Sequence, residues 1–122
     1  MLDILFMLVL ALFVTHELDA IGRHEWRIFP ITNRMNERNG YAVFVLAHLP
    51  LMLIIFWLSF GEAPASEFVR GALAGFAIVH VGLHWLYRKH PKNEFGNPLS
   101  QAIIWSTGGA GLLYLLVRLT IR

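Results

Sequence analysis

The stretch Leu2–Gly22 reads LDILFMLVLALFVTHELDAIG, and its length and composition decide the fold class. A helix that crosses the hydrocarbon core of a bilayer needs about 20 predominantly apolar residues. This stretch is long enough, and its first half is apolar apart from Asp3. A signal peptide is the alternative, but the start of the stretch has no Lys or Arg and no small-residue cleavage site follows Val14. We therefore predict a retained membrane-spanning helix.

Three more apolar stretches of similar length follow, at about 41–60, 68–87 and 99–119. Of the 122 residues, 57% are hydrophobic and only 15% are charged, whereas a soluble domain has roughly 25% charged residues. The runs are too long for strands, and they do not alternate between apolar and polar residues. The sequence therefore predicts an all-α fold, in which residues 1–122 form one integral membrane domain. It is a bundle of four transmembrane helices with both termini on the same side of the lipid bilayer.

Composition also excludes several classes of function. The chain has no cysteine, so disulfide frameworks, thiolate metal sites and cysteine nucleophiles are excluded. The formal net charge is only +2, and the basic residues lie in the loops between apolar runs. A nucleic-acid-binding protein would carry them along one face. We therefore expect no nucleic-acid partner.

The distribution of Lys and Arg predicts the orientation. Seven of these residues lie at the two loops that follow the first and third spans, and three lie at the other side. Cytoplasmic loops are enriched in Lys and Arg. The two basic loops are thus expected in the cytoplasm, and the termini and the Glu62–Glu67 loop outside. The longer basic loop, residues 23–39, is either a segment lying in the membrane interface or a plain surface loop.

Four of the six histidines share one leaflet in this arrangement. At about 1.5 Å per residue, His16, His48, His80 and His84 lie roughly 6–12 Å inside the cytoplasmic boundary of their spans. Glu17 and Asp19 neighbour His16 in the sequence. Ionisable residues inside a membrane are expensive and usually face the bundle interior or a wet cavity. Spans that alternate in direction therefore bring their polar residues to one level.

Imidazoles and carboxylates at one level are typical of a metal site. His80 and His84 are four residues apart and so lie on one helix face. Such nitrogen and carboxylate ligands suit zinc or non-haem iron. We predict that the metal is bound by His16, Asp19, His48, His80 and His84, with Asp19 either a ligand or the partner that orients a histidine. Glu17 is the predicted general base. The substrate would be a small molecule in the membrane, with hydrolytic or oxidative chemistry.

Other interpretations stay open. Intramembrane histidines often hydrogen-bond helices to each other, so the cluster could be a structural or proton-handling network in a scaffold or subunit. His48 with His80 or His84 could ligate a haem axially, as in an electron carrier. Gly71 and Gly75 form a GxxxG motif, which allows close approach of a helix of the same chain or of a second copy in a homo-oligomer.

The motifs resemble those of a family of small bacterial membrane proteins that is described only as a domain of unknown function. The resemblance lies in Thr15-His-Glu-Leu-Asp-Ala20, in His24-Glu-Trp-Arg27, and in the later motifs around His48, His80, His84 and Asn93 to Ser100. A broader group named for a His-x-x-Glu-Glu motif has a similar layout, but Asp19-Ala20 stands here in place of Glu-Glu. The resemblance implies a four-helix membrane protein, located in the inner membrane of a bacterium. It also implies that His16, Glu17, Asp19, Glu25, His80 and His84 act as a set, and it implies no activity.

Overall fold

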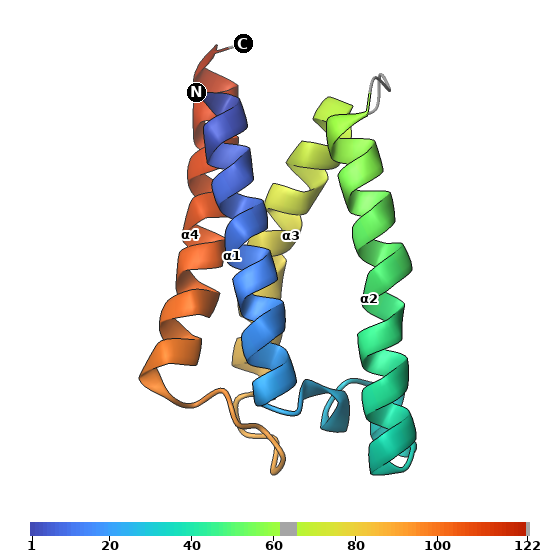
Figure 1. Ribbon diagram of the computed structural model, residues 1–122. Helices are drawn as coiled ribbons and strands as arrows, with labels where there is room; N and C mark the ends of the chain where they lie inside the picture. Colours follow the sequence, from blue (N-terminus) through green and yellow to red (C-terminus); the bar gives the residue numbers. More distant parts are fainter. Residues whose placement is uncertain (62–65, 122) are drawn as a thin grey trace.

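The computed structural model describes residues 1–61 and 66–121, and it consists of four long helices with short connections (Figure 1). These helices are α1 (Leu2–Gly22), α2 (Glu37–Phe60), α3 (Ser66–Tyr87) and α4 (Pro98–Ile121). Each is long and apolar enough to cross a membrane. The prediction of an all-α fold with four such helices is confirmed. The first predicted range coincides with α1, and the other three lie within α2, α3 and α4, which extend beyond them by a few residues.

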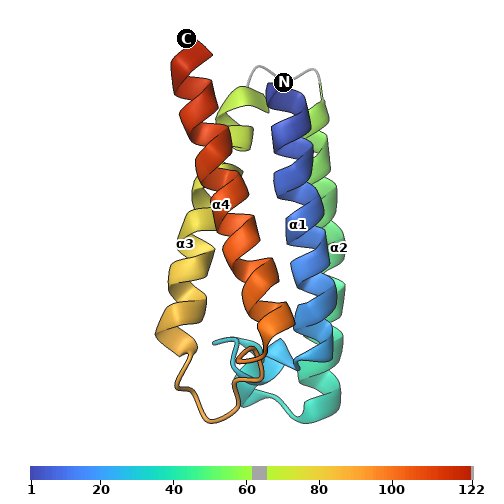
Figure 2. The same ribbon diagram turned by 90° about the vertical axis from the view of Figure 1, so that its left-hand side faces the viewer.

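The helices run alternately up and down, so the N- and C-termini lie at the same end of the bundle (Figure 1). At the other end lie the connection between α1 and α2 and the connection between α3 and α4 (Figure 2). The half of the bundle next to these two connections contains His16, His48, His80 and His84. We call it the loop-side half. The sequence prediction of a common level for the four histidines therefore agrees with the topology.

The packing of the helices is uneven. Helix α4 packs closely on α1 and α3, and the contacts of α2 are fewer. Helices α2 and α3 are close near the connection between them and diverge toward the loop-side half (Figure 1). A core of buried side chains lies among α1, α3 and α4, and includes Phe6, Val9, Phe13, Ala77 and Tyr114. The divergence of α2 leaves room beside the histidines.

The ends of the helices follow from local sequence. Asn36 caps α2 by accepting a hydrogen bond from the Asn39 amide, at 2.9 Å. Asn97 in the same way accepts from the Ser100 amide, at 2.9 Å, and Pro98 opens α4. Asn is favoured at the N-cap and Pro at the first helical position. These caps fix where the polypeptide leaves and enters the loop-side half.

The 23–36 segment folds back under the bundle instead of extending away from it. It contains two short turns of 3₁₀-helix, Glu25–Arg27 and Thr32–Arg34. Trp26 and Ile28 are buried, in a cluster with Phe44 and Phe95, whereas Phe29 and Ile31 are exposed. The segment thus combines a buried face with exposed apolar side chains. Its predicted position in the membrane interface remains a prediction.

Two other sequence expectations meet the structure only in part. An added Cβ on Gly71 would meet the Arg118 side chain of α4, whereas Gly75 has open space around it. Gly71 therefore faces a helix of the same chain, and a homo-oligomer through this motif remains a prediction. Glu62 and Arg122, which entered the prediction of orientation, lie outside the described residues.

Candidate metal centre

Three histidines from two helices converge on one point in the loop-side half. The Nε2 atom of His16 lies 2.9 Å from Nε2 of His80 and 3.2 Å from Nε2 of His84. The Nε2 atoms of His80 and His84 are 3.1 Å apart. His80 and His84 are on the same face of α3 because they are one helical turn apart. We call His16, His80 and His84 the histidine triad, and it could hold a metal ion.

Hydrogen bonds cannot satisfy all three contacts of the triad. Each Nε2 of a neutral imidazole carries either a proton or a lone pair. Among three such atoms at least two are alike, so at least one of the three contacts pairs two protons or two lone pairs. A cation accepts all three lone pairs at once. Tetrahedral zinc with Zn–N distances of about 2.0–2.1 Å keeps its ligand atoms about 3.3 Å apart, which is close to the separations in the triad.

The triad is shielded from the surroundings by aromatic side chains. His16 is fully buried, and the side chain of His84 is 8% exposed. The ring of Phe95, from the connection between α3 and α4, lies edge-on to His84 with centroids 4.6 Å apart. Phe13 of α1 contacts His80 in the same way at 5.9 Å. A low-polarity shell of this kind strengthens electrostatic binding of a cation.

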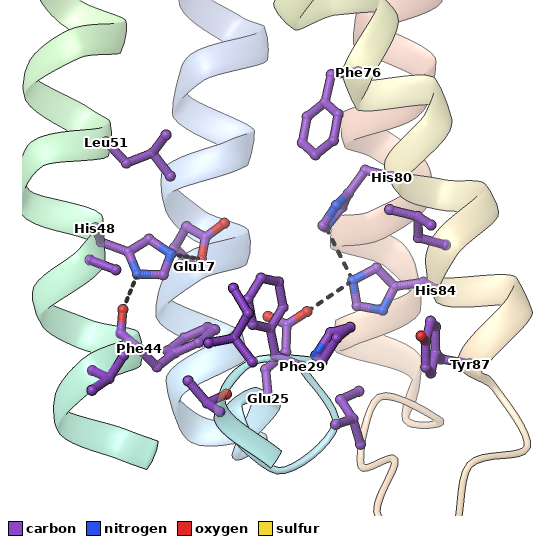
Figure 3. A pocket seen from close by; sticks show the side chains of 17 residues that line it. Glu17, Glu25, Phe29, Phe44, His48, Leu51, Phe76, His80, His84 and Tyr87 are labelled. Atoms are coloured by element: carbon purple, nitrogen blue, oxygen red, sulfur yellow. Dashed lines mark hydrogen bonds and ion pairs between the residues drawn. The ribbon is translucent and has the colours of Figure 1, made fainter. Parts of the chain in front are cut away.

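Glu25 is the carboxylate next to the triad. Its Oε1 lies 3.8 Å from Nε2 of His84, and its side chain is 15% exposed (Figure 3). Burial is the largest of the effects that raise the pKa of the Glu25 carboxyl to about 8, and the nearby Glu17 and Asp19 carboxylates contribute to this rise. A carboxyl group in this state is protonated at neutral pH unless a cation takes the place of the proton. Its distance of 3.8 Å from His84 places the Glu25 carboxyl beside the point where the triad could hold a metal ion.

The two other predicted ligands lie outside the triad. Asp19 forms an ion pair with Arg23, with its Oδ1 3.2 Å from Nε. His48, on α2, forms an ion pair with Glu17, with Nε2 2.8 Å from Oε2, and its Nδ1 lies 2.6 Å from the Phe44 carbonyl oxygen. Of the five residues predicted as ligands, the structure thus brings three together, and the metal role of His48 and Asp19 is a prediction that this geometry does not favour.

Three polar atoms around the site are buried without a hydrogen-bond partner among the described residues. They are the Nδ1 atoms of His16 and His80 and Oδ2 of Asp19. A buried polar atom without a partner costs about 1–3 kcal/mol. Such atoms occur where a fold holds groups for binding or where a water molecule or ion completes the network. Their clustering at the triad supports a functional interpretation of this region.

An apolar cavity of about 490 Å³ opens between α2, α3 and the 23–36 segment. Its size is within the range of small-molecule sites. Two polar groups face each other across it (Figure 3). One consists of Glu25, His80 and His84, and the other of Glu17 and His48. The divergence of α2 from α3 therefore creates a chamber with His80 and His84 of the triad on one wall.

Sequence reasoning missed two features of this site. Phe95, from the connection between α3 and α4, covers the triad, and it was not included in the site predicted from sequence. Asn93 and Asn97 bond backbone groups of their own connection, and Glu94 bonds His24. Glu25 was included in the set implied by the resemblance but was not predicted to be a ligand. Its place beside the triad follows from the turn at His24, whose φ of 54° the residue type does not reveal.

The chain matches a family of unknown function (DUF6713) over residues 2–121, and it therefore belongs to this family. The resemblance in the His16-Glu-Leu-Asp-Ala20 and later motifs agrees with this membership. No curated protein and no solved structure matches the chain. The family description assigns no activity.

Proposed function

We propose that this member of DUF6713 is a membrane-embedded metalloprotein whose histidine triad holds a zinc or non-haem iron ion. The observation that carries the proposal is the convergence of three Nε2 atoms within 3.2 Å of one another. Bundle interiors build metal sites in this way, from side chains on facing helices. The Lys and Arg distribution supports a position of this centre in the cytoplasmic half of the membrane.

Glu25 completes the centre in this proposal. Its carboxylate lies on the cavity side of the triad, at 3.8 Å from His84, and supplies the fourth ligand after a small movement. The three histidines and Glu25 leave a position for water or substrate when the metal expands its coordination. This ligand set is narrower than the one predicted from sequence, because it omits His48 and Asp19.

The chemistry would act on a small molecule in the cavity, by hydrolysis or by oxidation. A metal-bound water is a nucleophile at neutral pH, and it needs a proton acceptor. Glu17, which shares the cavity with the triad and is paired with His48, is the proposed general base. The apolar lining supports a substrate that partitions into the membrane.

Elemental analysis and an absorption spectrum of the protein purified in detergent without chelators test the proposal. We expect about one zinc or iron per chain and no Soret band. The variant with both His80→Ala and His84→Ala should lose the metal and keep its helical circular dichroism. His90→Ala is the matched control, because His90 lies outside the triad in the connection after α3 and bonds the Lys92 amide. Absence of metal from the wild type, or its retention in the double variant, would contradict the proposal.

A structural hydrogen-bond network is the second candidate function of the cluster. It is favoured by the separations of 2.9–3.2 Å between the three Nε2 atoms, because histidines inside a membrane often hydrogen-bond helices to each other. In that case the double variant would lose thermal stability and the wild type would hold no metal.

A haem is disfavoured, because axial ligands approach from opposite faces of the macrocycle, whereas the triad converges and His48 is bonded to Glu17.

A further inference from the structure

The cavity beside the triad has the composition of a site for a molecule with a long apolar part. Its walls between the two polar groups are formed by aliphatic and aromatic side chains from α2, α3 and the 23–36 segment. Among them are Ile28, Phe29, Phe44, Leu51, Phe76 and Leu83. All of these lie in or next to helices that are able to span a membrane. A molecule that fits this lining would come from the lipid phase and not from water.

The wall opposite the triad contains Glu17 and His48, which form a pair without net charge. The Phe44 carbonyl can only accept, so Nδ1 of His48 donates to it, at 2.6 Å. Nε2 of His48 lies 2.8 Å from Oε2 of Glu17, and the two groups share the remaining proton. Whichever of them carries it, the pair has no net charge. The Glu17–His48 pair is therefore compatible with apolar surroundings.

The same pair separates the cavity from a second one. This second cavity, of about 280 Å³, lies between α1 and α2 and is lined by Glu17, His48 and apolar side chains. Those side chains are Val14, Leu18, Ile21, Val45, Met52 and Phe56. Because both cavities contain Glu17 and His48, they are neighbours on the two sides of the pair. An apolar chain longer than the first cavity would have a further apolar compartment within reach.

A metal ion on the triad would leave one positive charge without a partner. The three imidazoles are neutral ligands, a divalent ion contributes two positive charges, and Glu25 contributes one negative charge. Asp19 is compensated by Arg23 at 3.2 Å, and Glu17 by His48. An unpaired charge in apolar surroundings is unfavourable. A ligand with a single negative charge would balance the charge of the metal centre. Because the cavity walls are apolar, the ligand that fits them also carries an apolar chain.

We propose that the cavity binds an anionic amphiphile of the lipid phase, a long-chain monocarboxylate, with its carboxylate at the metal and its chain among the apolar walls. This inference rests on the metal centre proposed above. It identifies the class of molecule on which the centre acts. It also gives the divergence of α2 a role, because the hydrocarbon chain of the ligand lies in the space between α2 and α3.

Photo-crosslinking tests the inference with palmitic acid that carries a diazirine in mid-chain. The probe is added to the purified, metal-containing protein in detergent, and labelled peptides are located by mass spectrometry. We expect label on the 28–31 and 43–51 segments. Unlabelled palmitate should reduce this label at least tenfold, and methyl palmitate, which has the same chain without the charge, should not. Removal of the metal should abolish the difference between acid and ester.

Two variants provide a matched pair. Ala47 lines the cavity, so Ala47→Trp should fill it and reduce labelling at least tenfold while the metal content is unchanged. Leu46, its neighbour on α2, is 67% exposed and lines neither cavity. Leu46→Trp should therefore be labelled like the wild type. The competition experiment needs only the wild type, so it decides the question even if a variant does not fold.

The outcomes separate this inference from the metal proposal. If the wild type holds metal but acid and ester compete equally, or if label is spread over lipid-facing residues, the amphiphile inference is wrong and the metal centre stands. If the wild type holds no metal, the metal proposal is wrong, and the preference for a carboxylate falls with it. Metal together with acid-selective labelling of the cavity supports both.

Discussion

At the scale of residues, the position of Glu25 depends on the backbone of His24. His24 has φ of 54°, in the left-handed region, and its Nδ1 is 3.0 Å from Oε2 of Glu94. A non-glycine residue in this region costs about 1–3 kcal/mol and is held by the surrounding structure. The turn reverses the chain directly after α1, so Glu25 points back toward the triad instead of away from it.

Replacement of Glu25 by Gln tests whether this carboxylate belongs to the centre. We expect Glu25→Gln to weaken zinc binding by about 10–100-fold, because the amide is a poorer ligand and leaves the positive charge of the ion uncompensated. Competition with a chromophoric chelator measures the affinity. Glu37→Gln is the control, because Glu37 bonds Arg27 and Trp26 near the same segment without contacting the triad. Equal affinities of the two variants would remove Glu25 from the site.

The Glu17–His48 pair should contribute to stability and not to metal retention. Hydrogen bonds between membrane helices have coupling free energies of about 0.6 kcal/mol on average and about 1.7 kcal/mol at most. A double-mutant cycle with Glu17→Gln and His48→Ala, followed by unfolding in mixed micelles, should give a coupling in this range. Both single variants should retain a full equivalent of metal. Loss of the metal in His48→Ala would restore the wider ligand set predicted from sequence.

The sequence predicted some residues of the site and not others, for physical reasons. His80 and His84 were predictable as a pair because their spacing of four places them on one helix face. Their level with His16 followed from counting residues along spans of opposite direction. His48 has the same depth, but depth does not determine which way a helix is rotated, and His48 faces Glu17. Glu25 depended on the backbone angle of His24, which its residue type does not encode.

At the scale of elements, the close packing of α3 on α4 depends on two glycines of α4. A Cβ on Gly111 would lie 2.5 Å from the Ala74 carbonyl oxygen and 2.9 Å from the Ala77 Cβ. A Cβ on Gly108 would lie 2.5 Å from a methyl group of Val81. Small residues at helix contacts allow backbones to approach closely in membranes. This contact holds the face of α3 that carries His80 and His84 in a fixed position.

Gly111→Ala should therefore destabilise the protein. The atom that the new methyl group meets is backbone, which cannot turn away, and overpacking of this kind costs about 1–3 kcal/mol. Gly109 is the matched control, since an added Cβ there has nothing within 4 Å. Gly109→Ala should be neutral or stabilise by up to about 1 kcal/mol. Thermal unfolding in detergent, followed by circular dichroism, measures both, and equal melting temperatures would contradict this account of the α3–α4 contact.

The elements themselves were the most predictable part of the molecule. Long apolar runs bounded by Asn, Gly and Pro predicted all four helices, because a spanning helix satisfies its own backbone hydrogen bonds whatever surrounds it. How the helices pack was less predictable. Beside the wide space between α2 and α3, side chains of the 23–36 segment such as Trp26 and Ile28 pack under the bundle. That contact is specified by tertiary structure and not by periodicity.

At the scale of the whole molecule, the two connections of the loop-side half are tied to each other by charged side chains. Arg27 bonds Glu37 at 2.8 Å and Glu94 at 3.3 Å, and His24 also bonds Glu94. The network joins the 23–36 segment to the connection between α3 and α4, directly beside the cavity and the triad. The basic residues that predict a cytoplasmic position are therefore on the same side of the bundle as the proposed centre.

The orientation can be measured directly, because the chain has no cysteine and single cysteines can be introduced without background. Lys92 lies in the connection between α3 and α4, and Thr120 lies near the end of α4 at the opposite end of the bundle; both are exposed. With the basic loops inside, a membrane-impermeant maleimide should label Thr120→Cys in intact bacterial cells. It should label Lys92→Cys only after the membrane is permeabilised. The reverse pattern would place the triad in the outer half of the membrane, and its substrate would then come from the outer leaflet.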